Sequence, residues 1–543
     1  MQTSTSRPSP AESTTASVEH DHEKSDRLSD RTIPVAPGHG ESAIPEDKNE
    51  EAIENLEDDW ENDPDNARNW PTIQRWTSMS IVSFYTLVPP LASSMMAPGL
   101  PEVAETYHLT NPTIIALTLS VFLISFALGA LWGFWLQILH IANIFTLVFS
   151  LGCAFSPNTG SLIAFRFMSG WSGAAPIAIG GGSVSDLFSE RDRASAMAIF
   201  SLGPLLGPAL GPIAGGFITQ TVGIKWVFIV IAITCGVASL VGIPLLRETY
   251  APVIRLRKAK KSADPEAAAR AHPALLHAHG SKMHVLWVNL TRPIIMLCRS
   301  MICFILSLYM AFLYGIYYLM FSTFANFFKT TYGFGPGIGG LAYIGLGGGF
   351  ILSTLIGAKF SDKVYNKLAQ KNGGKGKPEM RIPALFLGAL LIPVGLFWYG
   401  WSAQAKIHWI MPIIGSGIFG FGTYLSRLPP FFISPVKPRA PLAPTAVDDI
   451  NSKFRRLSYT LPIQLYLVDA FTYAASATSA ASVFRSLLGF AFPLFGQQMF
   501  DKLGTGGGNS LLAGLAIVLG IPFPIWLYYK GEEMRARNPL TRR

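Results

Sequence analysis

The sequence predicts an all-α membrane protein of about twelve spanning helices, arranged as two halves of six. Half of the 543 residues are hydrophobic, 14% are charged, and the mean hydropathy is +0.34, which is typical of multi-pass membrane proteins. Apolar runs of about 20 residues recur, the length that crosses a hydrocarbon core of about 30 Å. A long basic segment separates these runs into two sets of six, which suggests two related halves.

The first 69 residues predict a disordered, acidic tail. They contain 18 Asp or Glu and 6 Lys or Arg, with almost no apolar periodicity. They also lack the basic region and apolar core of a cleaved signal peptide. We therefore expect the tail to stay in the cytosol.

The apolar runs follow in order along the rest of the chain. The N-terminal half (70–246) and the C-terminal half (300–530) flank a basic central loop (247–299), and a basic tail (531–543) ends the chain. The tenth run is interrupted by a segment rich in proline and in basic residues, 423–460, which we expect to lie outside the membrane. The expected spans are 76–98, 113–134, 138–157, 161–182, 196–219, 226–246, 300–322, 336–357, 382–402, 409–468 with its interruption, 479–499 and 509–529.

Loop charges predict the orientation. The segment from Arg247 to Lys282 contains eight Lys or Arg and three acidic residues, and the segment from Lys359 to Arg381 contains seven Lys or Arg and two acidic residues. The loops on the other side hold at most one basic residue each. Because cytosolic loops carry the basic excess, we expect both termini and the central loop in the cytosol. The same excess is explained by a lipid bilayer, so we expect no nucleic-acid partner.

A glycine seam marks the fifth run. Four glycines recur every four residues and three prolines are interleaved with them, which places a flat glycine face along one side of a helix. Such a face allows close helix packing, and it could also slide or bend during a transport cycle. The residues are Gly203, Pro204, Gly207, Pro208, Gly211, Pro212, Gly215 and Gly216.

Charged residues near the spans are the candidates for coupling and gating. Arg166 lies early in the fourth run, where a charge is costly unless it faces a cavity or a partner. It can serve coupling or line the substrate path, or it can be structural if it reaches the outer surface. Asp186 just after the fourth run, and Asp469 and Arg485 at matching places in the second half, are either gate residues or solvated loop charges.

Other patterns carry less information. Within the aromatic seventh run, Tyr314 and Tyr317 are candidates to line a substrate path. The four cysteines show no metal-ligand spacing, and no phosphate-binding loop or hydrolase motif occurs, so we expect no metal, no cofactor and no enzymatic activity. An ion gradient, and not ATP, would then supply the energy for uphill transport.

The string from Gly207 to Gly216 resembles the antiporter motif of drug:proton antiporters in the major facilitator superfamily. Flanking strings are similar to the fungal twelve-span group of multidrug and polyamine exporters, among them Leu91–Pro101, Leu151–Phe167, Tyr466–Phe471 and Phe492–Phe500. The resemblance implies a major facilitator fold, alternating access, proton-driven efflux and a plasma-membrane location. It also implies that Arg166 belongs to a proton-coupling motif and that Gly357, Asp362 and Lys363 form the second-half copy of the inter-span loop motif.

Two segments depart from the family pattern. The charged loop that this family carries between the second and third spans reads here as the uncharged stretch 127–145, where Gln137, His140 and Asn143 are the polar candidates for the turn. The second departure is the insertion 423–460. Together they favour an error in the gene's assigned exon boundaries over an evolved mechanism.

We therefore expect a proton-coupled exporter of small amphipathic molecules, such as drugs, toxins, secondary metabolites or polyamines. We expect a monomer in the plasma membrane, with the vacuolar membrane as the alternative location. A defective family member without transport activity, or one with wrongly assigned exons, is the first alternative, since both departures touch the expected gating regions. A proton-coupled importer is the other, and the antiporter motif disfavours it.

Overall fold

The structure, a computed structural model, describes residues 60–129, 136–261, 282–373, 377–427 and 474–538, together with positions 466, 470, 471 and 541. Within these residues every regular element is a helix, and one isolated bridge pairs Phe471 with Thr541. The predicted all-α class is confirmed. The prediction of a disordered tail concerns mainly residues 1–59, which lie outside the described part, as does most of the insertion 423–460.

The N-terminal half contains six long helices, with two short elements between the first pair. The short elements are η2 (Ala97–Gly99) and α3 (Leu100–Thr106). The long helices are α2 (Thr72–Ser94), α4 (Pro112–Gly129), α5 (Leu136–Ala154), α6 (Thr159–Leu187), α7 (Glu190–Val222) and α8 (Ile224–Leu245).

The C-terminal half follows after two helices that occupy the ends of the predicted central loop, α9 (Ala251–Lys261) and α12 (Lys282–Arg299). Short elements α14 (Pro336–Leu341) and η4 (Pro378–Arg381) precede two of its long helices. The long helices are α13 (Met301–Tyr332), α15 (Ile344–Lys371), α16 (Ile382–Gln404), α17 (Ile410–Arg427), α20 (Ala474–Gly520) and α21 (Pro522–Arg537).

The described helices supply twelve crossing segments. Nine helices in the described part of the chain are long and apolar enough to cross a membrane, and two shorter apolar helices, Leu139–Ala154 and Ile410–Ser426, accompany them. The last of the nine, Ser476–Arg537, runs through α20 and α21 and bends at Gly504, where φ is 72°, so it provides two segments, the second of which includes α21. The chain is therefore a multi-pass membrane protein with six crossing segments in each half, as predicted.

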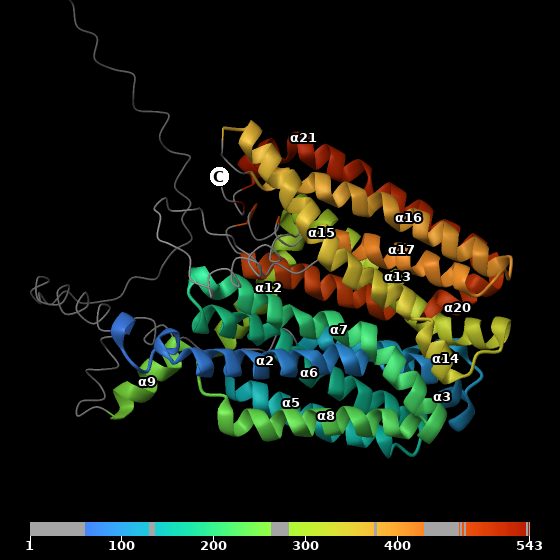
Figure 1. Ribbon diagram of the computed structural model, residues 1–543, viewed down its shortest axis with the longest axis horizontal. Coiled ribbons are helices and arrows are strands. Elements are labelled where there is room, and N and C mark those ends of the chain that lie inside the picture. The colour runs from blue at the N-terminus through green and yellow to red at the C-terminus, as the bar shows by residue number, and fades with distance from the viewer. Residues whose placement is uncertain are drawn as a thin grey trace, which may run out of the picture. The chain divides into compact units, whose positions relative to one another are not determined.

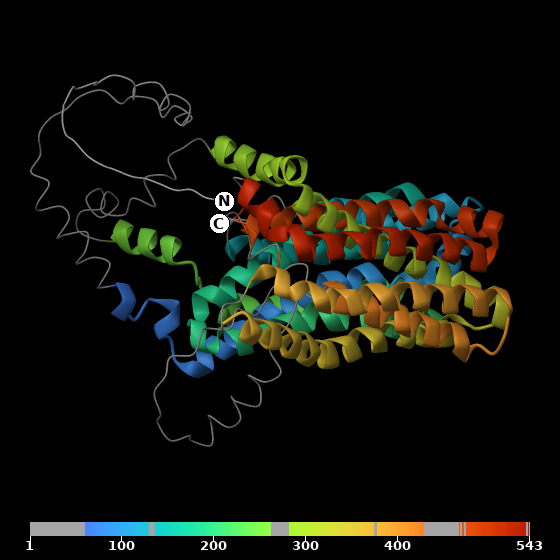
Figure 2. The same ribbon diagram turned by 90° about the horizontal axis from the view of Figure 1, so that it is seen from above.

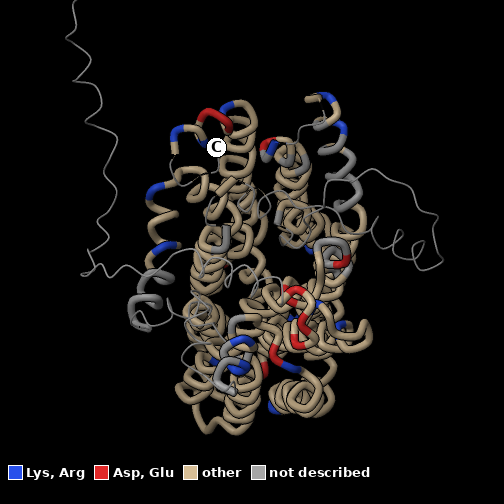
Figure 3. Tube along the Cα trace, turned by 90° about the vertical axis from the view of Figure 1, so that its left-hand side faces the viewer, with Lys and Arg blue, Asp and Glu red and all other residues tan. Residues whose placement is uncertain are grey.

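The helices run side by side along one common direction (Figures 1 and 2). We call their two ends the terminal end, where α6 ends at Leu187 and α7 begins at Glu190, and the opposite end, where α7 ends at Val222 and α8 begins at Ile224. Figure 3 faces the terminal end and shows charged residues on the connections there, whereas the helices behind are mostly uncharged. This separation of charge is what a hydrocarbon layer requires.

Local chemistry sets the bounds of several helices. At the start of α6, the Asn158 side chain accepts a hydrogen bond from the Ser161 backbone N–H, and Ser161 Oγ lies within bonding distance of the Asn158 backbone. Ser300 caps the start of α13 in the same way, by accepting from the Cys303 N–H. Helix α13 ends at Tyr332, and the next residue, Gly333, has a left-handed φ of 68° that suits glycine.

The expected turn between α4 and α5 is not seen, because residues 130–135 lie outside the described part of the chain. Our expectation that Gln137, His140 and Asn143 form this turn is wrong, because all three belong to α5. His140 and Asn143, whose side chains the structure describes, contact neighbouring helices instead.

Two of these polar side chains join neighbouring helices. The buried Asn143 amide donates to the Cys235 carbonyl and to Ser239 Oγ on α8, both at 2.8 Å. His140 Nδ1 lies 2.9 Å from the Tyr85 hydroxyl on α2. Within hydrocarbon such hydrogen bonds stabilise helix contacts because water does not compete for them.

The glycine seam of α7 packs against α2. A Cβ atom at Gly215 would lie 1.8 Å from the Met95 carbonyl oxygen, and one at Gly211 would lie 2.2 Å from Ser94 Oγ. Ser94 Oγ also donates to the Gly207 carbonyl at 3.3 Å. The predicted small-residue packing face is therefore confirmed, and its first partner is a helix of the same half.

The end of the predicted tail is ordered against α9. Lys258 Nζ lies 2.5 Å from Asp63 Oδ2, and the Arg255 guanidinium lies 4.5 Å from the Trp60 ring centroid. Burial opposes the shift, but the hydrogen bond from Lys258 and its positive charge lower the pKa of the Asp63 carboxyl overall. The tail as predicted extends too far, since its last residues pair with the basic segment after α8.

We predict that Gly215→Ala lowers the thermal stability of the purified protein. The added methyl has no room beside the Met95 carbonyl, so α7 and α2 must separate, at a cost of about 1–3 kcal/mol. Thermal unfolding in detergent measures the change. Gly514→Ala is the matched control, because a Cβ there meets no heavy atom within 4 Å. Equal unfolding temperatures for both variants would contradict the prediction.

Candidate functional site

A cavity of about 360 Å³ lies between the two halves. Helices α2, α4, α6 and α7 line it from the N-terminal half, and α13, α15, α17 and α20 line it from the C-terminal half. Its wall is mostly apolar and aromatic, with a few hydroxyl groups and one arginine, which is the usual composition of a small-molecule site. The polar groups on α20 are Thr478, Ser479, Ser482 and Arg485.

A larger groove of about 580 Å³ is the weaker candidate. It runs along α2 and α8, from Thr72 to Val241, and its lining belongs to one half only. No movement between the halves would open or close it. We therefore place the functional site in the central cavity.

Tyrosines of α13 form an aromatic wall in this cavity. Tyr314, Tyr317 and Tyr318 all line it, and the Tyr314 and Tyr317 ring centroids lie 4.9 Å and 5.0 Å from that of Tyr318. The Tyr318 hydroxyl lies 2.9 Å from Ser93 Oγ on α2, which is a contact between the halves. The structure thus places the two predicted tyrosines at the cavity. Sequence reasoning missed Tyr318, because spacing alone does not tell an inward face from a lateral one.

Arg166 is buried, with 1% of its surface exposed. Its guanidinium donates to three backbone carbonyls: Ala92 on α2 at 2.8 Å, and Thr118 and Leu119 on α4 at 3.2 Å and 3.3 Å. Its carbon also lies 5.1 Å from the Phe122 ring centroid. Arg166 therefore joins α6 to α2 and α4.

The end of α2 explains this arrangement. Helix α2 ends at Ser94, so the Ala92 carbonyl is one of the last four, which have no partner within the helix. These carbonyls carry the negative end of the helix dipole, where a cation is favourable. A charge that is costly in hydrocarbon is thereby compensated by backbone groups that also need a partner.

Arg485 has a different setting. It lies on α20, about 16 Å along the helix from its start, and lines the cavity. Its guanidinium carbon is 5.3 Å from the Tyr314 ring centroid. Among the described residues, its buried Nε has no hydrogen-bond partner. Of the two roles left open by the sequence, that of a solvated loop charge is therefore wrong for Arg485.

The acidic candidates lie elsewhere. Asp186 is partly buried near the terminal end of α6, where it accepts a hydrogen bond from Thr249 at 3.4 Å. Twenty residues of α6 separate it from Arg166, which is about 30 Å along the helix. The structure does not bring these two side chains together. Asp469 lies outside the described residues.

The predicted second-half loop motif falls on helical backbone. Gly357, Asp362 and Lys363 all belong to the later part of α15, and their side chains lie outside the described part of the structure. The role of these residues stays a prediction.

The two halves meet at the opposite end. Lys329 on α13 lies 2.7 Å from Glu105 on α3, and Gln220 on α7 accepts from the Gly337 N–H on α14 at 2.9 Å. The glycine seam takes part as well, because a Cβ at Gly216 would lie 2.4 Å from the Pro336 carbonyl oxygen. The seam therefore faces α2 along most of its length and α14 at its end.

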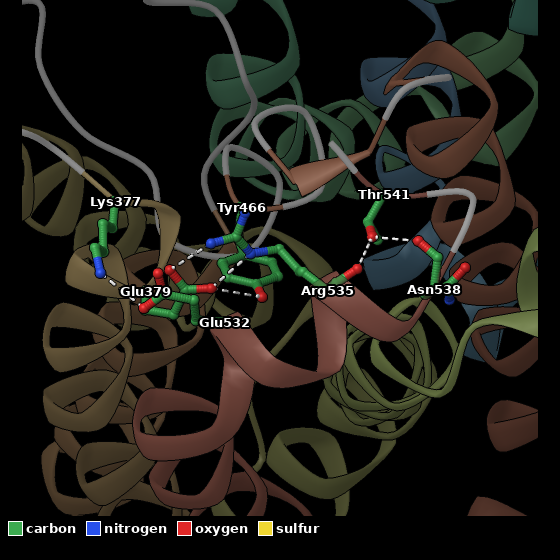
Figure 4. A network of polar contacts seen from close by, with 7 residues as sticks. All are labelled: Lys377, Glu379, Tyr466, Glu532, Arg535, Asn538 and Thr541. Carbon is green, nitrogen blue, oxygen red and sulfur yellow. Dashed lines mark hydrogen bonds and ion pairs between the residues drawn. The ribbon is translucent and has the colours of Figure 1, made fainter. Parts of the chain in front are cut away.

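An ion-pair network that the sequence did not reveal lies at the terminal end (Figure 4). Arg535 Nε and a terminal nitrogen donate to the two oxygens of Glu379 at 2.7 Å and 3.0 Å, and both side chains are nearly buried. Lys377 pairs with Glu532 at 2.7 Å, and both of these side chains are exposed. The network ties η4 to α21. The residues drawn are Lys377, Glu379, Tyr466, Glu532, Arg535, Asn538 and Thr541.

Two halves of six crossing segments around a central cavity are the architecture of a membrane transporter. Comparisons with known proteins identify the family. Residues 82–440 match the model of the Major Facilitator Superfamily. The chain therefore belongs to this superfamily.

Relatives narrow the group to fungal efflux transporters. The chain is 39% identical over 500 residues to the efflux pump radE of Floropilus chiversii, covering 90% of this chain and 86% of that protein. It is 37% identical to the MFS transporter cpaT of Aspergillus oryzae, covering 94% and 97%. The xylose transporter XylE of E. coli has the same fold, with 13% identity, a TM-score of 0.55, and coverage of 84% of this chain and 98% of that one.

We predict that Arg166→Leu destabilises the protein strongly. The change removes the donors of three buried carbonyls, and each unpaired buried group costs about 1–3 kcal/mol. The stability of Arg166→Lys is expected to lie between those of the parent protein and Arg166→Leu, since one ammonium cannot reproduce the planar fork of donors. Thermal unfolding in detergent measures the order. Arg68→Gln is the control, because Arg68 is exposed and makes one long contact, 3.4 Å to the Ser185 carbonyl. If Arg68→Gln lowered the unfolding temperature as much as Arg166→Leu does, the role of Arg166 in joining α6 to α2 and α4 would be contradicted.

Proposed function

We propose that this transporter exports small amphipathic molecules by proton-coupled alternating access. The observation that carries the proposal is the central cavity between the halves, together with the contacts that join the halves at its opposite end. In an alternating-access cycle these contacts hold the cavity closed on one side, so that ligand enters from the other.

The charge of the connections supports a cytosolic entry side. The described basic residues of the ranges 247–282 and 359–381 lie after α8, in α9 and at the start of α12, and in the later part of α15 and just before α16, all toward the terminal end. By the positive-inside bias the terminal end faces the cytosol, and both termini with it. A cavity that receives ligand from the cytosol suits an exporter in the plasma membrane.

Proton coupling requires a group that titrates. Arg166 stays protonated at any physiological pH, so its part is to hold α2, α4 and α6 in register. Asp186 and Asp469 are the acids that we propose as proton carriers, and Arg166 couples them to the cavity through helix movement and not by direct contact. The proton gradient replaces a bound cofactor, and the working unit is a monomer.

Export can be tested with a neutral dye. Yeast cells that lack their own exporters and express this chain are expected to accumulate several-fold less Nile red than cells with an empty vector. A protonophore is expected to abolish the difference, because the outward flux of dye draws on inward proton flux. Accumulation of dye is measured by cell fluorescence, with membrane-fraction protein amounts matched.

Outcomes against the proposal are distinct. A dye content equal to that of cells with an empty vector would contradict the export function and favour a family member without transport activity. Higher dye content that depends on the gradient would indicate import. Arg166→Lys at matched expression is expected to lower export, and export equal to that of the parent chain would contradict the role given to Arg166.

We predict that Gly216→Val prevents closure at the opposite end. The valine side chain would meet the Pro336 carbonyl and Gly340 of α14, so the halves cannot approach there. Transport of Nile red is expected to fall about tenfold while the folded protein remains. A Ser93→Cys probe in the cavity reports the conformation, since a membrane-impermeant thiol reagent added outside the cell should modify it faster in this variant.

The matched control for that experiment is Gly182→Val, where a Cβ meets no atom within 4 Å. Exposed Cys298 is replaced by Ser in all variants to remove background labelling. Equal labelling rates at Ser93→Cys in the Gly216 and Gly182 variants would show that the seam does not close the opposite end.

A further inference from the structure

The central cavity has a cationic character. Among its described lining residues Arg485 is the only one with a permanent charge, and that described lining contains no Asp, Glu, Lys or His. The other polar groups are hydroxyls of serine, threonine and tyrosine. A ligand in this cavity therefore meets one fixed positive charge.

The position of Arg485 makes that charge energetically significant. It lies about 16 Å from the start of α20, within the part of the helix that is apolar enough to cross the hydrocarbon layer. A cation at this depth is costly unless a partner or a wet cavity compensates it. A ligand with a negative charge supplies that compensation when it binds.

Comparison with Arg166 shows that Arg485 is not saturated by the protein. Each of the three guanidinium nitrogens of Arg166 donates to a backbone carbonyl. Arg485 lies over the Tyr314 ring at 5.3 Å, and its buried Nε has no acceptor among the described residues. Each guanidinium nitrogen of Arg166 thus has an acceptor in the protein, whereas the buried Nε of Arg485 has none among the described residues and is available to a ligand.

The chemistry of arginine then selects the ligand. A guanidinium does not release its proton in proteins, so Arg485 is no proton carrier. Its planar donors match the two oxygens of a carboxylate, or an enolate beside a carbonyl, better than any neutral group. An ammonium ligand would be repelled by Arg485 and would find no carboxylate in the described lining.

The remaining wall accommodates a flat body. Tyr314, Tyr317 and Phe350 contribute rings from the C-terminal half, with 5.3 Å between the Tyr317 and Phe350 centroids, and Phe122 and Phe126 contribute rings from the N-terminal half. Aromatic side chains favour flat, conjugated ligands. The volume of about 360 Å³ suits one small molecule.

We propose that the central cavity binds aromatic or conjugated organic anions, with a carboxylate or enolate group held by Arg485, and that it discriminates against polyamines and organic cations. This assignment rests on the proposed function and names its substrate class. It narrows the range expected from the sequence, which included polyamines.

Three probes of matched shape test the assignment: 2-naphthoate, 2-naphthylmethanol and 2-naphthylmethylammonium. Equilibrium dialysis against the purified full-length protein in detergent at neutral pH measures their binding. We expect 2-naphthoate to bind the parent protein most tightly. Arg485→Gln should weaken its binding about tenfold or more, because a hydrogen bond to a charged group is lost. The same change should leave the alcohol nearly unaffected and improve binding of the ammonium.

Two further variants make the outcome interpretable. Arg485→Lys keeps the charge and should lose less affinity for 2-naphthoate than Arg485→Gln. Lys502→Gln removes an exposed cation of α20 outside the cavity lining and should change nothing. Thermal unfolding of each variant confirms that it is folded before binding is compared.

The inference is overturned if the ammonium binds the parent protein best, if Arg485→Gln weakens all three probes alike, or if a folded parent protein binds none of them. These outcomes are separate from failure of the export function. If the protein prefers 2-naphthoate in dialysis but does not export Nile red, the anion-binding site stands and the proposed export function is wrong. If the protein exports the dye but Arg485→Gln leaves the selectivity among the three probes unchanged, the export function stands and only the anion-binding site is wrong.

Discussion

The buried guanidinium of Arg166 is the interaction on which the N-terminal half depends. Hydrocarbon offers no water to polar backbone, so the free carbonyls at the end of α2 need donors from the protein itself. Arg166 supplies them and reaches two carbonyls of α4 from the same group. The cost of burying the cation and the cost of leaving the carbonyls unpaired offset each other. The position of α2 relative to α4 and α6 follows from this contact.

The glycine seam needs α2 in that position. Its residues allow α7 to approach the backbone of α2 at Ser94 and Met95, immediately beyond the carbonyl that Arg166 holds. The last glycine of the seam, Gly216, meets α14 of the other half. One helix face thus continues from a contact within a half to a contact between halves. A shift of α2 would be transmitted along α7 to the closure at the opposite end.

Prediction from sequence succeeds most where hydrocarbon imposes a simple rule. Run lengths predict the crossing segments, since each must exceed the thickness of the membrane, and the four-residue glycine spacing predicts a packing face. The failures have equally physical causes. The polarity of Gln137, His140 and Asn143 suggests a turn, but a membrane helix also tolerates polar groups that find partners on its neighbours, as Asn143 does on α8. The pair of Glu379 and Arg535 joins residues 156 positions apart, and no local pattern reports such a contact.

The candidate site also shows what the sequence alone does not predict. In the sequence, Arg166 and Arg485 look alike, as single arginines within apolar runs. Only their surroundings separate them, because carbonyl acceptors saturate one and an aromatic cavity wall faces the other. A buried guanidinium whose three nitrogens all donate to backbone carbonyls holds helices together and is not exposed to a ligand. A guanidinium that lines the central cavity and keeps an unpaired Nε attracts an anion more strongly than a neutral ligand, so we expect Arg485 to determine what the cavity accepts.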